Sequence, residues 1–408
     1  MSGSKNAALP ILISSLLTEQ ECRFSRIPEL QDIRTTFKLL ESLGVRVNAN
    51  SDEKTASLCS KNIVTHEARY DLVRTMRASV VVLGPLLARF GQAKVSLPGG
   101  CAIGARPINY HLSGLEKLGA KIELESGYVI ASANKLRGNR VSFEFPSVTA
   151  TENIMMAATL AQGEALLENC AKEPEIVDLA RVLRAMGAEI EGEGTELIRI
   201  QGKPSLGGCK YEIMGDRIEA GTFLAAGFAT GGDVTVQGLD PEFIEAVIVK
   251  FEDAGAEVTR GSRSVKVRAL GRPKATDITT LPYPGFPTDM QAQFMALMSV
   301  AEGASVITET IFENRFMHVS ELARLGADIT IRGNTALIRG QTKLQGAPLM
   351  ATDLRASASL ILGGLCAEGE TLVNRIYHLD RGYEKMEEKL KKLGAEIERV
   401  KSQAGSEG

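Results

Sequence analysis

Apolar and polar positions along the chain follow one pattern six times. A segment with apolar residues three and four positions apart ends at a glycine, and a short segment of alternating polar and apolar residues follows it. This pattern is typical of an amphipathic helix, a helix C-terminus and a strand with one buried face. The six glycines lie 68 to 75 residues apart, at Gly44, Gly119, Gly187, Gly255, Gly326 and Gly394.

A second series precedes the first in each repeat. It is an almost wholly apolar segment, a turn and a short strand, seen in RFGQAKVSL, AQGEALLEN, TGGDVTVQG, AEGASVITE and AEGETLVNR, with a more distant copy in TEQECRFSR. Each repeat is therefore predicted to be helix, strand, helix, strand. No repeat carries a GxGxxG fingerprint or a Walker lysine loop, so the common nucleotide-binding doubly wound folds lose support.

The polar residue at the start of each apolar segment differs from copy to copy. Fourteen positions before the turn glycines, and at the equivalent place in the first copy, stand Arg77, Thr149, Asp289, Arg355 and Asn6. Helix capping would explain Thr149 and Asp289, but an arginine opposes the helix dipole at an N-terminus. Converging helix N-termini with such mixed side chains favour an anionic ligand.

Length and composition narrow the class of protein. The 408 residues predict two domains, and 44% apolar with 24% charged residues are typical of a soluble globular protein. A net charge of -3 argues against a general nucleic-acid binder. Six cysteines without a CxxC pair indicate a reducing compartment, the cytoplasm, and the four histidines lack the spacing of a metal site. The apolar stretch 7–17 is too short to span a bilayer and is predicted to be a buried helix.

Seven short motifs occur in order along nearly the whole chain. They are GSKNAALP (3–10), TMRAS (75–79), SLPGGCAIGARP (96–107), FPTDMQAQF (286–294), ENRFMHV (313–319), ATDLRASA (351–358) and HLDRGYE (378–384). Together they resemble the UDP-N-acetylglucosamine 1-carboxyvinyltransferase family. The resemblance implies transfer of the enolpyruvyl group of phosphoenolpyruvate to the 3′-hydroxyl of UDP-N-acetylglucosamine, with release of phosphate. This is the first committed step of bacterial peptidoglycan synthesis, and no metal or organic cofactor is implied.

The same resemblance implies a fold that agrees with the repeats. The expected architecture is an inside-out α/β barrel in two domains, built from six repeated units, three per domain, with helices inside and sheets outside. We expect the first domain to span 5–214 and the second 215–400. Relatives usually carry one further strand of the second domain ahead of the GSKNA motif. Where that strand is missing, we expect an unpaired sheet edge in the second domain.

An acid and a base are both needed for this reaction. Cys101 lies between Gly-Gly and Ile-Gly, in a loop that cannot build a core around it. We expect its thiol to protonate C3 of phosphoenolpyruvate, to add to C2, and to be the target of fosfomycin. The resemblance implies that Asp289 is the general base toward the 3′-hydroxyl. The alternative is that Asp289 only caps a helix, which is a common role of aspartate.

Phosphoenolpyruvate is a compact trianion, so several cations must converge on it. We expect Lys5, Arg106 and Arg381 to contact it, with Asn6 as a hydrogen-bonding partner. Lys5 and Arg381 are counted with Cys101 and Asp289 as catalytic. We expect the rest of the cleft to be lined by Arg315, Asp353 and Arg355. Glu173 and Glu175 are expected either to form salt bridges across the cleft or to start a helix.

The nucleotide sugar is expected to lie mainly against the first domain. The residues implied are Arg77, Arg106, Pro107, Ile108, Asn109, Tyr110, Phe145, Pro146, Ser147 and Val148, with Asp289 and Ile311 from the second domain. Asn109 stands where relatives more often have aspartate. Phe145–Pro146 replace a Lys-Val type dipeptide, so we expect a charged contact to the nucleotide to be missing there.

Two other functions are weighed against this one. A 5-enolpyruvylshikimate-3-phosphate synthase shares the fold and the phosphoenolpyruvate chemistry but lacks the cysteine loop. A non-catalytic binder of UDP-sugars has no need of both an acid and a base. No nucleic-acid or membrane partner is expected, and the oligomeric state is left open, a monomer included.

Overall fold

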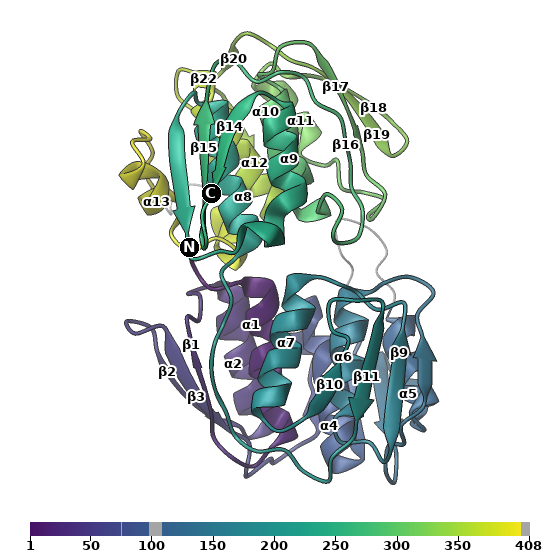
Figure 1. The fold of residues 1–408 in the computed structure, drawn as a ribbon. Helices are drawn as coiled ribbons and strands as arrows, with labels where there is room; N and C mark the ends of the chain where they lie inside the picture. Colours follow the sequence, from purple (N-terminus) through teal and green to yellow (C-terminus); the bar gives the residue numbers. More distant parts are fainter. Residues whose placement is uncertain (75, 98–107, 401–408) are drawn as a thin grey trace.

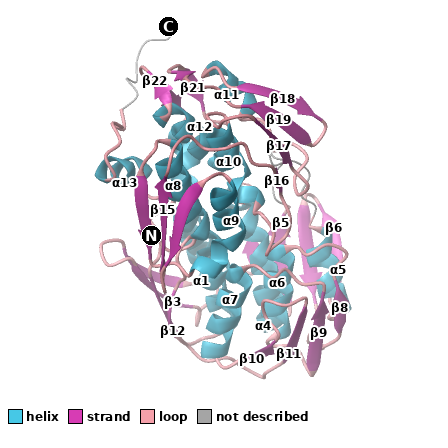
Figure 2. Cartoon of the chain, turned by 45° about the horizontal axis from the view of Figure 1, so that its top comes forward, coloured by secondary structure: helices cyan, strands magenta, loops and turns pink. Residues whose placement is uncertain are grey.

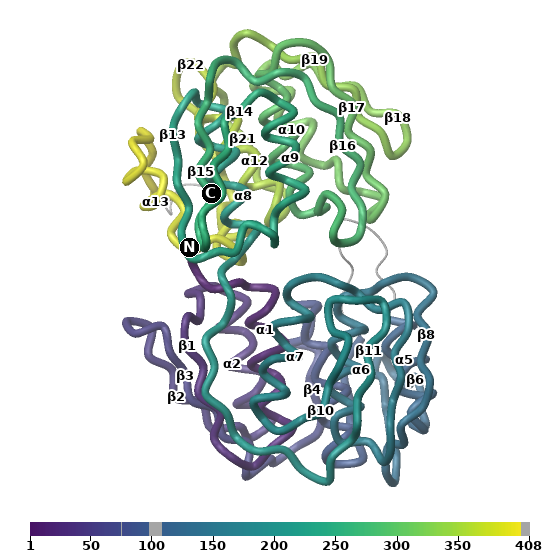
Figure 3. The backbone as a smooth tube through the Cα atoms, in the orientation of Figure 1, coloured from purple at the N-terminus to yellow at the C-terminus, as the bar shows by residue number. Residues whose placement is uncertain are grey.

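The protein is a mixed α/β chain with two lobes, described here from a computed structural model that covers residues 1–74, 76–97 and 108–400 (Figure 1). One lobe holds the elements up to about residue 213 and the other holds the rest. The chain passes between the lobes near its N-terminus and again near residue 215, and Figure 3 shows these two segments side by side. There Ser4 N donates to Met214 O at 2.7 Å, and Asp216 N donates to Ser2 O at 3.0 Å.

Buried helices lie at the centre of each lobe, and Figure 2 shows strands on the outer sides. In the first lobe they are α1 (Lys5–Ser14), α4 (Leu83–Phe90) and α6 (Val148–Ala158), and in the second they are α8 (Arg217–Ala229), α10 (Gln291–Met298) and α12 (Leu354–Leu365). Most of their residues are buried, which explains why these segments are apolar on every side. The apolar segment before Gly91 begins with 3-10 turns, η2 (Arg77–Val82), ahead of α4.

The amphipathic helices end where the sequence predicts. They are α2 (Gln31–Leu43), α5 (Asn109–Lys117), α7 (Pro174–Ala185), α9 (Glu245–Asp253), α11 (Val319–Arg324) and α13 (Met386–Lys392), and α3 (Tyr70–Val73) is a single extra turn. All six predicted glycines that follow them have φ between 90° and 105°. This left-handed conformation favours glycine, so the predicted helix C-termini are confirmed.

Each sheet of the first lobe has four strands, an antiparallel set of three plus one parallel strand. The orders are β12-β1-β3-β2, β4-β5-β7-β6 and β10-β11-β9-β8. Their bounds are β1 (Cys22–Ser25), β2 (Arg46–Asn50), β3 (Thr55–Cys59), β4 (Glu67–Ala68), β5 (Gln92–Ser96), β6 (Lys121–Glu125), β7 (Tyr128–Ser132), β8 (Arg140–Ser142), β9 (Glu164–Glu168), β10 (Glu189–Glu191), β11 (Leu197–Gln201) and β12 (Lys210–Glu212).

The sheets of the second lobe are less complete. The orders are β13-β15-β14, β16-β17-β19-β18, β20-β22 and β21-β23, and none of the sheets found in the described residues closes into a barrel. Their bounds are β13 (Asp233–Gln237), β14 (Ala256–Arg260), β15 (Ser264–Ala269), β16 (Ile278–Thr279), β17 (Ala304–Thr308), β18 (Asp328–Arg332), β19 (Thr335–Arg339), β20 (Leu344–Gln345), β21 (Pro348–Met350), β22 (Ala367–Glu368) and β23 (Leu372–Asn374).

Two places in the second lobe show what a strand needs. Among the described strands β13 pairs with β15 alone, so its other edge has no strand partner there. The prediction of a strand after Gly394 is wrong, because residues 395–400 form no strand. Alternating side chains are not sufficient, since a strand also needs a neighbour for its backbone hydrogen bonds, and no described strand pairs with this segment. Ile397 still packs against the core.

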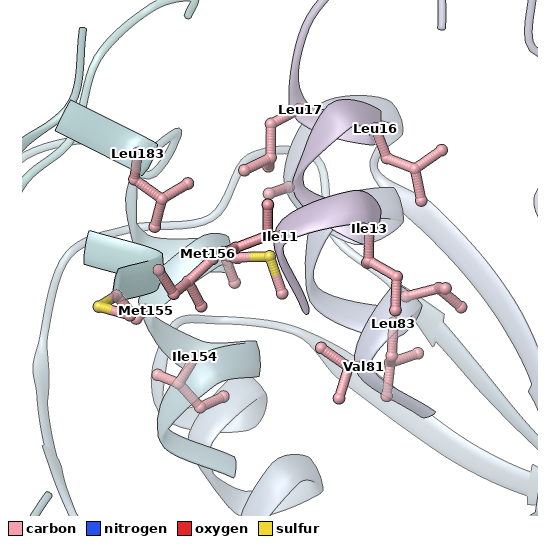
Figure 4. Packing of buried hydrophobic residues seen from close by; sticks show 14 of the residues in the cluster. Ile11, Ile13, Leu16, Leu17, Val81, Leu83, Ile154, Met155, Met156 and Leu183 are labelled. Carbon is pink, nitrogen blue, oxygen red and sulfur yellow. The ribbon is translucent and has the colours of Figure 1, made fainter. Parts of the chain in front are cut away.

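The hydrophobic core consists of two clusters. One runs from Ala7 to Ile213 and the other from Ile218 to Leu390. Figure 4 shows the first, where Ile11 of α1 meets Met156 of α6 near Leu183 of α7. Each fully buried side chain of this size contributes about 1.5–3 kcal/mol, so the central helices are held firmly and their N-termini have fixed positions. No helix of the described residues is long and apolar enough to cross a membrane.

Candidate active site

The polar residues predicted at the starts of the apolar segments lie in the first turns of the central helices or of the 3-10 turns that precede them. Asn6 is in α1, Arg77 begins η2, Thr149 is in α6, Asp289 is in η4 (Thr288–Met290) just before α10, and Arg355 is in α12. The same position of α8 is Arg217. The repeat predicts this sixth residue too, because Arg217 stands fourteen positions before Gly231.

Asp289 lies between two arginines of its own lobe. Its Oδ1 accepts a hydrogen bond from Arg315 Nη2 at 2.7 Å, and its Oδ2 accepts one from Arg355 Nη2 at 2.8 Å. Burial alone would raise the pKa of Asp289, but the two arginines hold it well below its usual range. The carboxylate is therefore ionised, and its hydrogen-bond partners here are side chains, whereas the N-cap residue of η4 is Pro287.

Arg315 is fixed by a chain of hydrogen bonds on one side of Asp289. Its Nη1 donates to Thr288 Oγ1 at 3.0 Å, and that hydroxyl donates to Glu309 Oε2 at 2.9 Å. The other oxygen of Glu309 accepts from the backbone N–H of Ile311 at 2.8 Å. The position of the half-buried Ile311 is thus tied to the position of Arg315.

Arg355 is fixed on the other side. Asp353 caps α12 by accepting from the backbone N–H of Arg355 at 2.9 Å, so Asp353 holds this residue by its backbone. The guanidinium lies over the ring of Tyr383 at 5.5 Å from its centroid. The hydroxyl of Tyr383 accepts from Gln293 Nε2, which also donates to the backbone oxygen of Asp289 at 2.9 Å. This buried network leaves Arg355 little freedom.

A second cluster joins the two lobes. Asp32, in the first turn of α2, accepts from Lys5 Nζ on its Oδ2 at 2.9 Å and from Arg381 Nε on its Oδ1 at 3.0 Å. Lys5 begins α1 of the first lobe, and Arg381 ends η5 (Ile376–Arg381) of the second. Two of the cations predicted to bind phosphoenolpyruvate are therefore next to each other.

The third cluster is an ion pair that also joins the two lobes, and both of its side chains are buried. Arg217 Nε donates to both carboxylate oxygens of Glu175 at 3.0 and 3.2 Å, and the two side chains are 8% and 3% exposed. Close by, Glu173 is the N-cap residue of α7. Burial raises the pKa of Glu173, and its Oε2 has no hydrogen-bond partner among the described residues.

Most residues predicted for the nucleotide sugar lie at two neighbouring helix N-termini. Ile108 is the N-cap residue of α5, and Asn109 and Tyr110 form its first turn. Ser147 is the N-cap residue of α6, where its hydroxyl accepts from Ala150 N at 3.4 Å. Helix N-termini attract phosphate groups, so this arrangement suits a pyrophosphate. Before α6 come the half-buried Pro146 and Phe145, which is 41% exposed, and Val148 is the first residue of α6.

The two helix starts are joined by a buried histidine. His111 of α5 has one ring nitrogen 3.2 Å from Thr149 Oγ1 and the other 2.9 Å from Asn153 Nδ2. Burial, with a smaller effect of the nearby Arg77, lowers the pKa of His111 to about 3. The imidazole is neutral at pH 7 and acts as a connector between α5 and α6.

Cys101, Arg106 and Pro107 lie outside the described residues, so their predicted roles stay predictions. The five described cysteines, Cys22, Cys59, Cys170, Cys209 and Cys366, are free. Burial raises the pKa of the Cys170 and Cys366 thiols to about 12, which makes both unreactive near pH 7. No group of three or more potential metal ligands occurs among the described residues.

Three charged residues of these clusters, Arg217, Asp32 and Glu309, were not predicted from the sequence. Arg217 was detectable, because it occupies the repeat position already singled out in the other copies. Asp32 was not, because it is one acidic residue in the first turn of an ordinary amphipathic helix, where aspartate is common. Only the fold brings it to Lys5 and Arg381.

Structural comparison finds the same fold in two solved proteins. The enolpyruvyl transferase NikO from Streptomyces tendae matches with a TM-score of 0.88 at 24% identity, covering 97% of this chain and 94% of NikO. An EPSP synthase from Acinetobacter baumannii matches with a TM-score of 0.74 at 19% identity, covering 97% of this chain and 95% of that one. At these identities the likeness shows the fold alone.

Sequence comparison is more specific. The profile of EPSP synthase (3-phosphoshikimate 1-carboxyvinyltransferase) matches residues 1–390, and the chain belongs to this family. A UDP-N-acetylglucosamine 1-carboxyvinyltransferase from Trichlorobacter lovleyi is 60% identical over 401 residues, which cover 98% of this chain and 95% of the relative. A protein of the same name from Thermodesulfovibrio yellowstonii is 58% identical over 405 residues, with 98% and 96% covered.

Proposed function

We propose that this chain transfers the enolpyruvyl group of phosphoenolpyruvate to the 3′-hydroxyl of UDP-N-acetylglucosamine and releases phosphate, in peptidoglycan synthesis. The observation that carries the proposal is the identity of 58–60%, over nearly the full length, with relatives named for this reaction. The site supports it, because cations of both lobes meet at Asp32, which suits an anionic substrate, and Asp289 is an ionised carboxylate, which suits a general base.

The cations around Asp32 are assigned to phosphoenolpyruvate. Lys5 and Arg381 approach from different lobes, and a phosphate or carboxylate between them replaces part of their contact with Asp32. Arg106 is assigned to the same substrate from its motif, and the half-buried Asn6 lies one residue after Lys5. Binding of the substrate thus depends on the lobes coming together.

Asp289 is proposed as the general base toward the 3′-hydroxyl. Both of its oxygens are occupied by arginines, and this lowers its proton affinity. To take a proton, Asp289 must exchange one arginine contact for the sugar hydroxyl. A bound anion provides the competing partner for Arg315 or Arg355, and this exchange raises the pKa of Asp289 when the substrates are in place.

The remaining assignments complete the chemistry. Cys101 is proposed to protonate C3 of phosphoenolpyruvate and to be alkylated by fosfomycin, as its loop and its basic neighbour Arg106 suggest. The nucleotide is assigned to the starts of α5 and α6, with Arg77 beside them and Ile311 from the second lobe. We place the reaction in the cytoplasm, as the unpaired cysteines favour.

We also propose that the chain is an inside-out α/β barrel of six repeated units in two domains, 5–214 and 215–400, that close on the substrates. Support comes from the separate hydrophobic clusters and from central helices that recur at the same place of each repeat. Ion pairs between the lobes then form part of the closing surface.

One assay separates this function from its alternatives. Phosphate release is measured with phosphoenolpyruvate and either UDP-N-acetylglucosamine or shikimate 3-phosphate as the acceptor. We expect release with the nucleotide sugar alone. Release with shikimate 3-phosphate instead would identify a 5-enolpyruvylshikimate-3-phosphate synthase. Binding of the nucleotide sugar without any release would identify a non-catalytic binder.

A further inference from the structure

Asp32 is an enclosed carboxylate with cations on both of its oxygens. Its side chain is 4% exposed, and it accepts from Lys5 Nζ at 2.9 Å and from Arg381 Nε at 3.0 Å, with Arg381 Nη2 at 3.4 Å from the shared oxygen. Burial alone would raise the pKa of Asp32, but Lys5 and Arg381 hold it below its usual range. The group is therefore a fixed negative charge.

The position of Asp32 in the fold is also fixed. It lies in the first turn of the 13-residue helix α2, where the helix dipole stabilises a carboxylate. Leu30, the N-cap residue of α2, and Ile33 of α2 lie on either side of it in the sequence, and both are in the core. Asp32 therefore cannot follow its cations when they move, and it defines where they rest.

The two cations differ in how firmly they are held. The Lys5 side chain is 11% exposed, and its backbone N–H donates to Asp216 Oδ2 at 3.2 Å. The Arg381 side chain is 37% exposed and lies at the end of the short helix η5. Without Asp32, two like charges would face each other, and the exposed Arg381 would turn into water.

We propose that Asp32 is a positioning residue, which holds Lys5 of one lobe and Arg381 of the other in a common orientation for phosphoenolpyruvate. This inference rests on the proposed function, because it assigns both cations to that substrate. Asp32 does not bind the substrate itself. It keeps two like charges close enough to share one small anion, which neither lobe does alone.

The competing explanation is that Asp32 only joins the lobes. The chain offers a matched control for it, since Lys54 Nζ and Glu384 Oε1 form another ion pair between the lobes at 2.7 Å. Lys54 lies in the turn between β2 and β3 and is 42% exposed. Neither partner contacts Lys5 or Arg381 in the contacts described, so Lys54→Gln weakens the join without touching the cation pair.

The test compares steady-state phosphate release by the full chain, Asp32→Asn, Asp32→Glu and Lys54→Gln. Phosphoenolpyruvate is varied at saturating UDP-N-acetylglucosamine, and then the reverse. We expect Asp32→Asn to raise KM for phosphoenolpyruvate about ten-fold, the effect of one lost charge-assisted hydrogen bond, with KM for the nucleotide sugar nearly unchanged. Asp32→Glu keeps the charge and should recover part of this loss, and Lys54→Gln should behave as the unmodified chain.

Each result of these assays either supports or overturns the positioning role of Asp32. Equal KM values for phosphoenolpyruvate in Asp32→Asn and the unmodified chain overturn the positioning role, and so does an equal rise in Lys54→Gln, which indicates a general join. If Asp32→Asn does not fold, Asp32→Glu carries the test, because it must raise KM for phosphoenolpyruvate alone. If the unmodified chain releases no phosphate, the proposed function fails first, whereas normal turnover with an insensitive Asp32→Asn sinks only this inference.

Discussion

Two carboxylates of this molecule each hold two cations, but they draw them from different places. Asp289 takes both arginines from its own lobe, and those side chains are 6% and 5% exposed. Asp32 takes Lys5 from its own lobe and Arg381, which is 37% exposed, from the other. The first cluster needs no residue of the other lobe, whereas the second needs residues of both lobes. The proposed chemistry at Asp289 and the proposed substrate binding at Lys5 and Arg381 thus rest on different kinds of contact.

The largest effect in this comparison of the Asp289 and Asp32 clusters is expected at Asp289. We expect Asp289→Asn to reduce turnover about 10²–10⁴-fold, because a general base is lost, while KM for UDP-N-acetylglucosamine changes little. Steady-state phosphate release measures both quantities. Turnover close to that of the unmodified chain would leave Asp289 with a structural role only, as the partner of Arg315 and Arg355.

The buried pair between Glu175 and Arg217 adds a contact that crosses the lobes but excludes water. Glu175→Gln leaves the guanidinium of Arg217 enclosed without its charge partner, so we expect the free energy of unfolding to fall by about 3–5 kcal/mol. Denaturant unfolding followed by circular dichroism measures this. The control is Glu164→Gln, which breaks the exposed pair with Arg199 and should cost no more than about 1 kcal/mol. Equal losses in the two variants would contradict the burial argument.

His111 provides the smallest effect, as a buried group without a charge partner. Its pKa is lowered to about 3 in the folded chain, against about 6.5 when unfolded. As pH falls below 6.5 the unfolded chain binds this proton first, so the folded state loses about 1.4 kcal/mol per pH unit until pH approaches 3. His111→Gln can keep the hydrogen bonds to Thr149 and Asn153 and should remove this loss. The unfolding free energies of the unmodified chain and of His111→Gln should therefore approach each other as the pH is lowered from 7 to 4.5. A constant difference between the two chains over this range would contradict a lowered pKa of His111 in the folded chain.

The repeat in the sequence predicted much of the fold because it encodes local geometry. A glycine after an apolar helical pattern requires a left-handed backbone, and all six predicted glycines have it. The pattern was insufficient at residues 395–400, where alternation is present but the described residues supply no paired strand. Strand formation depends on a partner elsewhere in the chain, and a local pattern does not contain that information.

The candidate site divides in the same way. Asp289 and Arg355 were predicted because the repeat marks the first turn of each central helix, and Arg217 was within reach of the same count. Asp32 and Glu309 do not occupy this repeat position. Asp32 contacts Lys5, which lies 27 residues earlier in the sequence, and Glu309 contacts Thr288, which lies 21 residues earlier. Contacts that fold topology creates must be read from the structure.

The two chain crossings between the lobes have a mechanical consequence. Because the segments near Gly3 and Gly215 are hydrogen-bonded side by side, they form a two-stranded hinge between the lobes. We expect such a joint to bend about one axis more easily than it twists, so the proposed closure would carry the second lobe toward the first along one path. Arg381 would then meet Lys5 in the same place at each closure, and the proposed recognition of a small anion by the two lobes would be reproducible.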